Sequence, residues 1–102
     1  MATFVTVAKT HELAPDQGKL VEINHKRIAL FNVGGRYYAI DDMCPHRGGP
    51  LSKGELEGMT VVCPWHDASF DLATGALIRS PAATGVATYE VRIEGEDIAV
   101  AV

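Results

Sequence analysis

Apolar and polar residues alternate along most of the chain in short runs, the pattern that is typical of β-strands. Turn residues separate the runs at intervals of roughly 8–12 positions, as they do in small barrels and sandwiches. No segment long enough for a stable helix shows a helical period. The expected strands cover residues 3–7, 19–24, 27–33, 36–40, 59–62, 69–72, 76–78, 88–93 and 98–102. The pattern therefore predicts an all-β fold.

Paired glycines give the clearest turn signal in the chain. Gly34 and Gly35 separate the apolar run at 27–33 from the run at 36–40. Tight two-residue turns need backbone conformations with positive φ, which glycine adopts without a steric penalty. These two runs are therefore predicted to form a β-hairpin. Residues 15–18 leave room for one short turn.

Composition and charge narrow the class of protein. A length of 102 residues predicts a single domain, 1–102, and an apolar content of 47% argues against disorder. A formal net charge of −4 argues against a nucleic-acid-binding protein, which needs a basic surface. No apolar run approaches the roughly 18 residues of a membrane span, and the N-terminal segment lacks the apolar core of a secretory signal. We therefore expect a cytoplasmic protein that binds neither nucleic acid nor membrane.

Two irregular segments interrupt the strand pattern, at residues 41–54 and 63–69. The first contains two prolines and three glycines, and together the segments hold both cysteines and two of the four histidines. Irregular loops in a compact domain usually carry function. Two cysteines are too few for a disulfide scaffold, so the composition of these loops points to metal ligation.

The chemistry of the two loops depends on the metal. Cys44-Pro45-His46 and Cys63-Pro64-Trp65-His66 each offer one thiolate and one imidazole, and 16 residues separate them. Zinc would take all four ligands on one tetrahedral ion. A [2Fe–2S] cluster could take the two thiolates on one iron and the two imidazoles on the other. Zinc motifs usually pair Cys with Cys and His with His, but the spacing alone leaves both metals open.

The two loops closely resemble the Rieske [2Fe–2S] motif. The resemblance rests on C-P-H-R-G-G-P-L at 44–51 and C-P-W-H at 63–66, and is supported downstream by F-D-x-x-T-G at 70–75 and S-P-A at 80–82. It implies that one cluster is bound, with one iron held by the sulfur atoms of Cys44 and Cys63. The ring nitrogens of His46 and His66 would hold the other iron.

The same resemblance carries expectations about the fold. It implies three antiparallel sheets, with a cluster-binding subdomain at roughly 42–82 forming one tip of the molecule. Pro81 matches a third loop that covers the cluster. Gly48 and Trp65 are expected beside the cluster, Trp65 as an apolar cover.

Departures from the high-potential branch of the family predict a low reduction potential. That branch has an extra cysteine in each loop, joined by a disulfide, where this chain has Gly49 and Trp65. It also places a serine and a tyrosine hydroxyl near the cluster sulfurs, where this chain has Ala68 and Phe70. Hydrogen bonds to the sulfurs favour the reduced cluster, so we expect a potential of about −150 mV rather than +300 mV.

Several charged or titratable residues have less definite roles. Asp67 stands where the family commonly has glycine; its carboxylate would disfavour reduction and favour protonated His66, or it is simply solvated. Asp41 and Asp42 are expected to be a solvated acidic pair or a docking site for a partner. The remaining histidines, His11 and His25, are expected on the surface, and Tyr89 on a strand face.

The resemblance implies a stand-alone Rieske-type ferredoxin, a one-electron carrier rather than an enzyme. Such proteins take electrons from a flavin-dependent reductase and pass them to a terminal oxygenase that hydroxylates aromatic or related compounds. The chain is too short for an oxygenase domain, and it shows no second iron site with two histidines and a carboxylate. We expect a monomer when the protein is isolated.

Two alternatives stay open. Small Rieske proteins also occur as fixed subunits of assimilatory nitrite reductases, where the domain would co-purify with a complex. In a third hypothesis the four ligands bind structural zinc, the metal contributes only folding energy, and the protein is a binding module.

Overall fold

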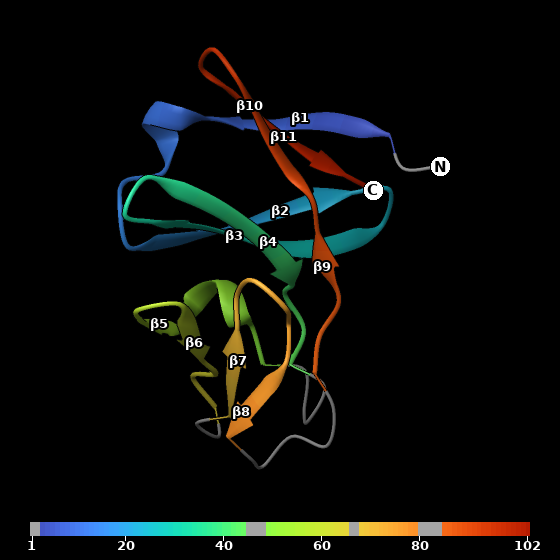
Figure 1. Cartoon of the computed structure of the whole chain (residues 1–102). Coiled ribbons are helices and arrows are strands. Elements are labelled where there is room, and N and C mark those ends of the chain that lie inside the picture. Colours follow the sequence, from blue (N-terminus) through green and yellow to red (C-terminus); the bar gives the residue numbers. More distant parts are fainter. Residues whose placement is uncertain (1–2, 45–48, 66–67, 80–84) are drawn as a thin grey trace.

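The chain folds into three antiparallel sheets, as expected for this class (Figure 1). The structure, a computed structural model, describes residues 3–44, 49–65, 68–79 and 85–102. Within these residues the strands are β1 (Phe4–Lys9), β2 (Gln17–Ile23), β3 (Lys26–Val33), β4 (Arg36–Asp41), β5 (Glu55–Glu57), β6 (Thr60–Val62), β7 (Ser69–Asp71), β8 (Leu77–Arg79), β9 (Thr88–Tyr89), β10 (Val91–Glu94) and β11 (Asp97–Ala101).

The sheets follow one another along the molecule. The upper sheet in Figure 1 has the order β1-β11-β10, and the middle sheet the order β2-β3-β4-β9. The lower sheet, β5-β6-β7-β8, lies at the end of the molecule that is farthest from both termini. In the described parts of the chain no helix has the length and apolar character that a membrane crossing requires.

The middle sheet separates two hydrophobic cores. Ile28 and Leu30 of β3 pack towards the upper sheet, in a cluster with Ile98 of β11. Their neighbours Ala29 and Phe31 point to the opposite face and pack with residues of the lower sheet. All four β3 residues are 0% exposed. This burial on both faces explains why the centre of β3, residues 28–31, is continuously apolar rather than alternating.

The predicted hairpin between the runs at 27–33 and 36–40 is confirmed. Gly34 and Gly35 have φ values of 60° and 94°, and the backbone N–H of Gly35 donates to the Asn32 side-chain oxygen at 2.8 Å. The β2–β3 turn has no glycine, yet Asn24 and His25 also take positive φ. That turn was not predicted, because its residues give a weaker turn signal than paired glycines do.

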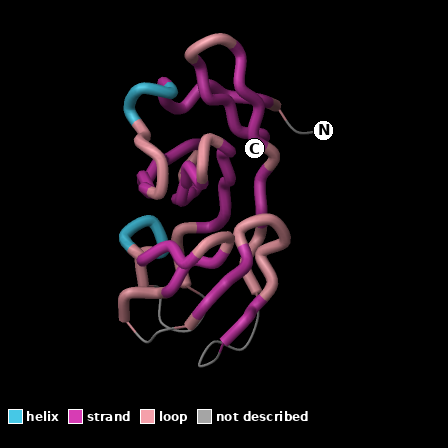
Figure 2. The backbone as a smooth tube through the Cα atoms, turned by 60° about the vertical axis from the view of Figure 1, so that its left-hand side comes forward, coloured by secondary structure: helices cyan, strands magenta, loops and turns pink. Residues whose placement is uncertain are grey.

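The chain departs from the predicted elements in four places. The single strand expected at 88–93 is two strands: β9 pairs with β4 in the middle sheet and β10 pairs with β11 in the upper sheet. β5 was not predicted, and neither were the 3-10 helices η1 (Thr10–Glu12) and η2 (Leu51–Lys53), which Figure 2 shows in cyan. These elements have three residues each, too few to establish a period.

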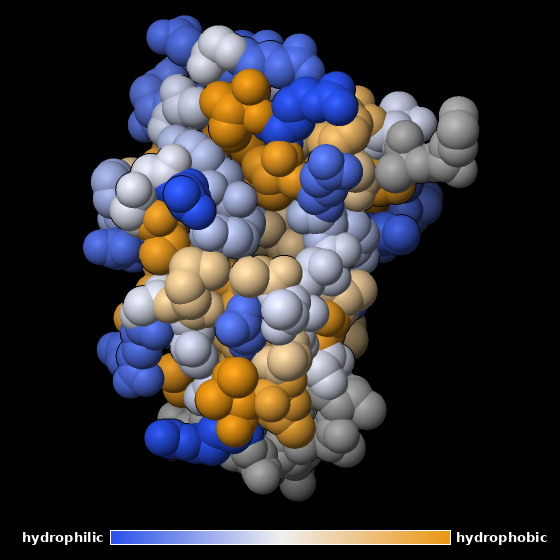
Figure 3. Space-filling model, in the orientation of Figure 1, coloured by the Kyte–Doolittle hydropathy of each residue, from blue (hydrophilic) through white to orange (hydrophobic). Residues whose placement is uncertain are grey.

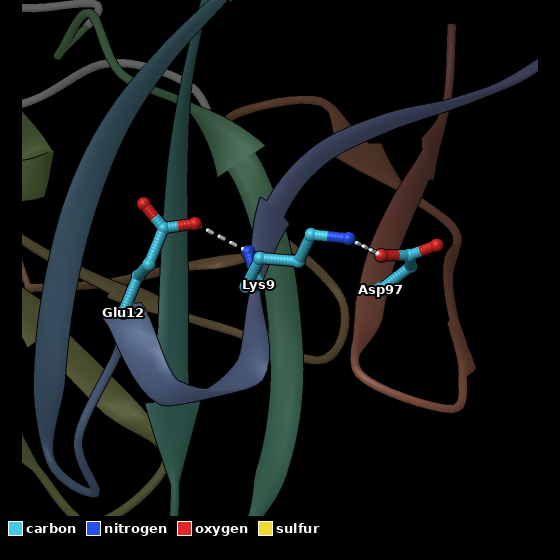
Figure 4. A network of polar contacts seen from close by, with 3 residues as sticks. All are labelled: Lys9, Glu12 and Asp97. Carbon is cyan, nitrogen blue, oxygen red and sulfur yellow. Dashed lines mark hydrogen bonds and ion pairs between the residues drawn. The ribbon is translucent and has the colours of Figure 1, made fainter.

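Polar contacts that the pattern of apolar residues does not show hold η1 in place. Glu12 accepts a hydrogen bond from the backbone N–H of Lys9 at 2.6 Å, and the Lys9 ammonium pairs with the Asp97 carboxylate on β11 (Figure 4). Residues 15 and 16 form the short turn for which the sequence left room, and Asp16 there has a φ of 62°. The first helical turn lies earlier in the chain, and β2 already begins at Gln17.

Candidate metal centre

The two cysteine loops are closed in the same way. The backbone N–H of Cys44 donates to the carbonyl of Gly49 at 2.9 Å, and that of Cys63 donates to the carbonyl of Ala68 at 2.7 Å. In both loops the bond joins a cysteine to the residue five positions later. Each closed loop contains one predicted histidine ligand. The two halves of the predicted ligand set therefore stand on loops of matching construction.

Both cysteines lie in the core between the middle and lower sheets. Cys44 is 2% exposed and Cys63 is 1% exposed, and both belong to one cluster of buried residues. They do not form a disulfide. The structure thus brings together the two predicted sulfur ligands. The other predicted ligands, His46 and His66, lie outside the described residues, as do Gly48, Asp67 and Pro81.

Gly49 joins the first loop to the second. A Cβ atom built on Gly49 would lie 2.8 Å from the Cys63 sulfur and 3.2 Å from the Cγ and Cδ2 atoms of the Trp65 indole. The backbone of the first loop therefore lies directly against the cysteine and the tryptophan of the second. Because these positions hold glycine and tryptophan, no disulfide can form between them.

Two buried side chains in the same loop and the strand that follows it bear on the expected potential. Ala68 and Phe70 are both 0% exposed, and Phe70 packs in the same core cluster as the two cysteines. Neither side chain has a hydroxyl. The low potential expected from these two residues stays a prediction.

Exposed apolar side chains gather at this end of the molecule. Met43, Trp65 and Ile78 are 60%, 56% and 60% exposed, and all three lie in the segment predicted to bind the cluster. Figure 3 shows apolar side chains over β8 at the lower end. Single exposed apolar residues are ordinary, but a group of them beside a functional loop is typical of a surface that meets a partner.

Of the expectations for the remaining titratable residues, one is confirmed and one is wrong. His11 and His25 are exposed, as expected. Asp42 is only 1% exposed, so the expectation of a solvated acidic pair is wrong for this residue. It failed because the groups that bind Asp42 come from segments distant in the sequence, which no local pattern shows.

The donor set of the two loops fits an iron–sulfur cluster. Buried cysteines that are not in a disulfide offer soft thiolate ligands, which select zinc or iron–sulfur clusters rather than hard cations. The absence of a Cβ at Gly49 leaves space beside the Cys63 sulfur that a side chain would fill. Each cysteine is followed within three residues by a histidine.

The fold and these loops define a Rieske iron–sulfur protein. The model of the Rieske [2Fe–2S] domain matches residues 3–90, so the chain belongs to this family. It accordingly carries a [2Fe–2S] cluster bound by two cysteines and two histidines, and it is an electron-transfer component rather than an enzyme on its own.

Within the family the chain resembles ferredoxins. It is 53% identical over 72 residues to the 3-phenylpropionate/cinnamic acid dioxygenase ferredoxin subunit of Escherichia coli (strain K12), covering 70% of this chain and 68% of the relative. The ferredoxin of carbazole 1,9a-dioxygenase from Nocardioides aromaticivorans IC177 superposes with a TM-score of 0.92 at 30% identity, covering 97% of each chain. A putative small subunit of an NADPH nitrite reductase superposes with a TM-score of 0.84 at 25% identity, covering 96% of this chain and 97% of that one.

Proposed function

We propose that this ferredoxin carries single electrons from a flavin-dependent reductase to a terminal oxygenase of the aromatic-ring-hydroxylating type. The observation that carries the proposal is the pair of matching cysteine loops, in a chain that is 53% identical over 72 residues to a dioxygenase ferredoxin subunit. The protein acts in the cytoplasm as one domain, residues 1–102.

The ligands in this proposal are Cys44 and Cys63 on one iron and His46 and His66 on the other. When bound, the cluster supplies a site that gains and loses one electron. The backbone bond of each cysteine to its own loop closes that loop at the cysteine. The apolar core around both cysteines excludes water from the sulfurs and keeps them away from competing oxidants.

The exposed apolar residues serve the transient contact with partners. Met43, Trp65 and Ile78 offer apolar surface at the end of the molecule that carries the cluster loops. Electron-transfer partners usually share small interfaces and separate quickly. Three such side chains give contact area without the large patch that would make the ferredoxin a permanent subunit.

A reconstituted assay tests this function. The purified protein is added to the reductase and oxygenase of an aromatic dioxygenase system, and product formation is followed with and without the ferredoxin. We expect product only when the ferredoxin carries its cluster, and none with a Cys63→Ala variant. If cluster-loaded protein accepts no electrons from a flavin reductase and reduces no oxygenase, the proposed function is wrong.

The similarity to a nitrite reductase small subunit supports a second candidate. In that case the domain would be a fixed part of a complex. Size exclusion of a native extract separates the two: a diffusing carrier elutes at the mass of one chain, whereas a fixed subunit elutes with its complex. The third hypothesis, a zinc-stabilised binding module, conflicts with membership of the Rieske family. A coloured protein excludes it directly.

A further inference from the structure

Asp41 and Asp42 stand at the end of β4, immediately before the loop that contains Cys44. They are adjacent in sequence but make different contacts, as neighbouring residues of a strand do when they point to opposite faces. Each carboxylate accepts a hydrogen bond from a segment that is distant in the sequence.

Asp41 holds the segment that follows residues 80–84. Its backbone N–H donates to the carbonyl of Ala87 at 3.0 Å, and its carboxylate accepts a hydrogen bond from the Tyr89 hydroxyl at 2.6 Å. The side chain and the backbone of one residue thus hold the same short stretch. The pKa of Tyr89 is raised to about 12, first by burial and then by its hydrogen bond to Asp41. The phenol therefore keeps its proton, and the bond persists, throughout the physiological range.

Asp42 holds the other side of the first cysteine loop. Its backbone carbonyl accepts a hydrogen bond from the N–H of Leu51 at 2.7 Å, and its carboxylate accepts one from the N–H of Ser52, also at 2.7 Å. Here again the side chain and the backbone bind a single segment, the start of η2. The Arg27 guanidinium lies 3.7 Å from the second carboxylate oxygen of Asp42, whose side chain is 2% exposed.

The segment that Asp42 binds, η2 with the residue after it, also lies against the base of the second cysteine loop. A Cβ at Gly54, the residue after η2, would collide with the carbonyl oxygen of Val62, which immediately precedes Cys63. The bases of the loops that begin at Cys44 and Cys63, and the strand that follows residues 80–84, are therefore linked through Asp41 at the end of β4, Asp42 after it, and η2.

We propose that Asp41 and Asp42 are positioning residues that set the relative placement of the cluster loops, and that the buried carboxylate of Asp42 also lowers the cluster potential. A buried negative charge two residues from Cys44 disfavours the reduced and more negative cluster, and half-exposed Arg27 offsets it only in part. This inference rests on the proposal that Cys44 and Cys63 are ligands.

The first test measures how firmly the cluster is held. Purified holoprotein is mixed with an iron chelator, and the loss of visible absorbance is followed with time. Tyr89→Phe and Asp41→Ala each remove the same hydrogen bond, so we expect each to speed cluster loss at least threefold. The double variant should lose the cluster no faster than the single variants, because coupled residues give non-additive effects. Asp41→Asn, which keeps an acceptor oxygen, should retain most of the wild-type half-life.

The second test separates the charge of Asp42 from its structural contacts. Asp42→Asn keeps an oxygen for the Ser52 N–H but removes the charge, so the midpoint potential should shift in the positive direction. Asp97→Asn, which removes an equal charge from an exposed ion pair on β11, is the matched control and should leave the potential and the rate of cluster loss unchanged.

The outcomes distinguish this inference from the proposed function. Cluster loss at the wild-type rate in Tyr89→Phe would overturn the positioning role, and an unchanged potential in Asp42→Asn would overturn the effect of its charge, each in a protein that still carries its cluster. If Asp42→Asn fails to fold, Tyr89→Phe and Asp41→Ala still decide the positioning role, and Arg27→Gln, which removes the cation that faces Asp42, decides the charge effect: it should shift the midpoint potential in the negative direction, and an unchanged potential would overturn that effect. A wild-type protein that binds no iron would instead defeat the proposed function itself.

Discussion

Replacing Gly49 with alanine tests the contact between the two cysteine loops. The added Cβ would lie 2.8 Å from the Cys63 sulfur, whereas non-bonded heavy atoms usually approach to about 3.5–4.0 Å. Gly49 does not have positive φ, so the strain is steric and not conformational. One of the two groups has to move by close to an ångström.

The two groups that meet the new methyl differ in their freedom to move. The Trp65 indole is 56% exposed and can turn away into solvent. The Cys63 sulfur cannot turn once it is bound to iron, but it can adopt another rotamer in the apoprotein. Overpacking of this kind costs about 1–3 kcal/mol. In a domain of this size that corresponds to a fall in Tm of roughly 5–20 °C.

The assay is thermal unfolding of the holo and apo forms, together with the visible spectrum of the holo form. We expect the holoprotein to lose several times more stability than the apoprotein, with an altered spectrum. Gly58→Ala in the β5–β6 turn is the matched control: it introduces strain at a φ of 61° but meets no atom within 4 Å, so the spectrum should not change. Equal destabilisation of the two forms of Gly49→Ala, or none, would refute the reasoning.

Three further predictions follow from side chains described above. Phe70→Tyr and Ala68→Ser should each raise the midpoint potential by tens of millivolts, since a hydroxyl within reach of a sulfur favours the reduced cluster. Unchanged potentials would show that these two residues do not set the midpoint potential. Tyr89 should contribute stability that is present below pH 10 and lost as the pH rises towards about 12, because its pKa is raised in the folded state. The difference titration between wild type and Tyr89→Phe should show a midpoint of about 12, and a midpoint near 10 would contradict the part-buried hydrogen bond to Asp41. The Asp97 carboxylate raises the pKa of Lys9, so this ion pair contributes stability below the ordinary lysine pKa, and that stability is lost as the pH rises through the raised value. Since both groups are exposed, Asp97→Asn should barely change the free energy of unfolding measured with denaturant at pH 7, and a large loss of stability would contradict this.

Most of the fold could be predicted from the pattern of apolar residues. β3 and β4 and the glycine turn between them follow from a buried run, a two-glycine break and a second run. Elements of three residues, such as β5 and η2, could not be predicted, because they are shorter than any period that a pattern can establish. The division of residues 88–93 between two sheets is a tertiary effect: both halves have strand character, and only pairing with β4 and β11 separates them.

The two cysteine loops of the candidate site could be predicted from the sequence, but the contacts that support them could not. Cys44 and Cys63 can be recognised as candidate ligands from their spacing and from the histidines that follow them. The role of Asp42 cannot be recognised in this way, because its burial depends on Arg27 and Ser52, which approach it only in the folded chain. Gly49 was noted as the place of an absent cysteine, yet its contact with the Cys63 sulfur depends on how the two loops pack.

The most direct test of the central claim is a potentiometric titration of the anaerobically purified protein, followed by low-temperature EPR. We predict that reduction produces a rhombic signal with a low average g value, characteristic of a histidine-ligated [2Fe–2S] cluster, with a midpoint of about −150 mV. A clearly positive midpoint would contradict the role assigned to Ala68 and Phe70. A colourless protein that contains stoichiometric zinc and gives no signal on reduction would contradict electron transfer altogether.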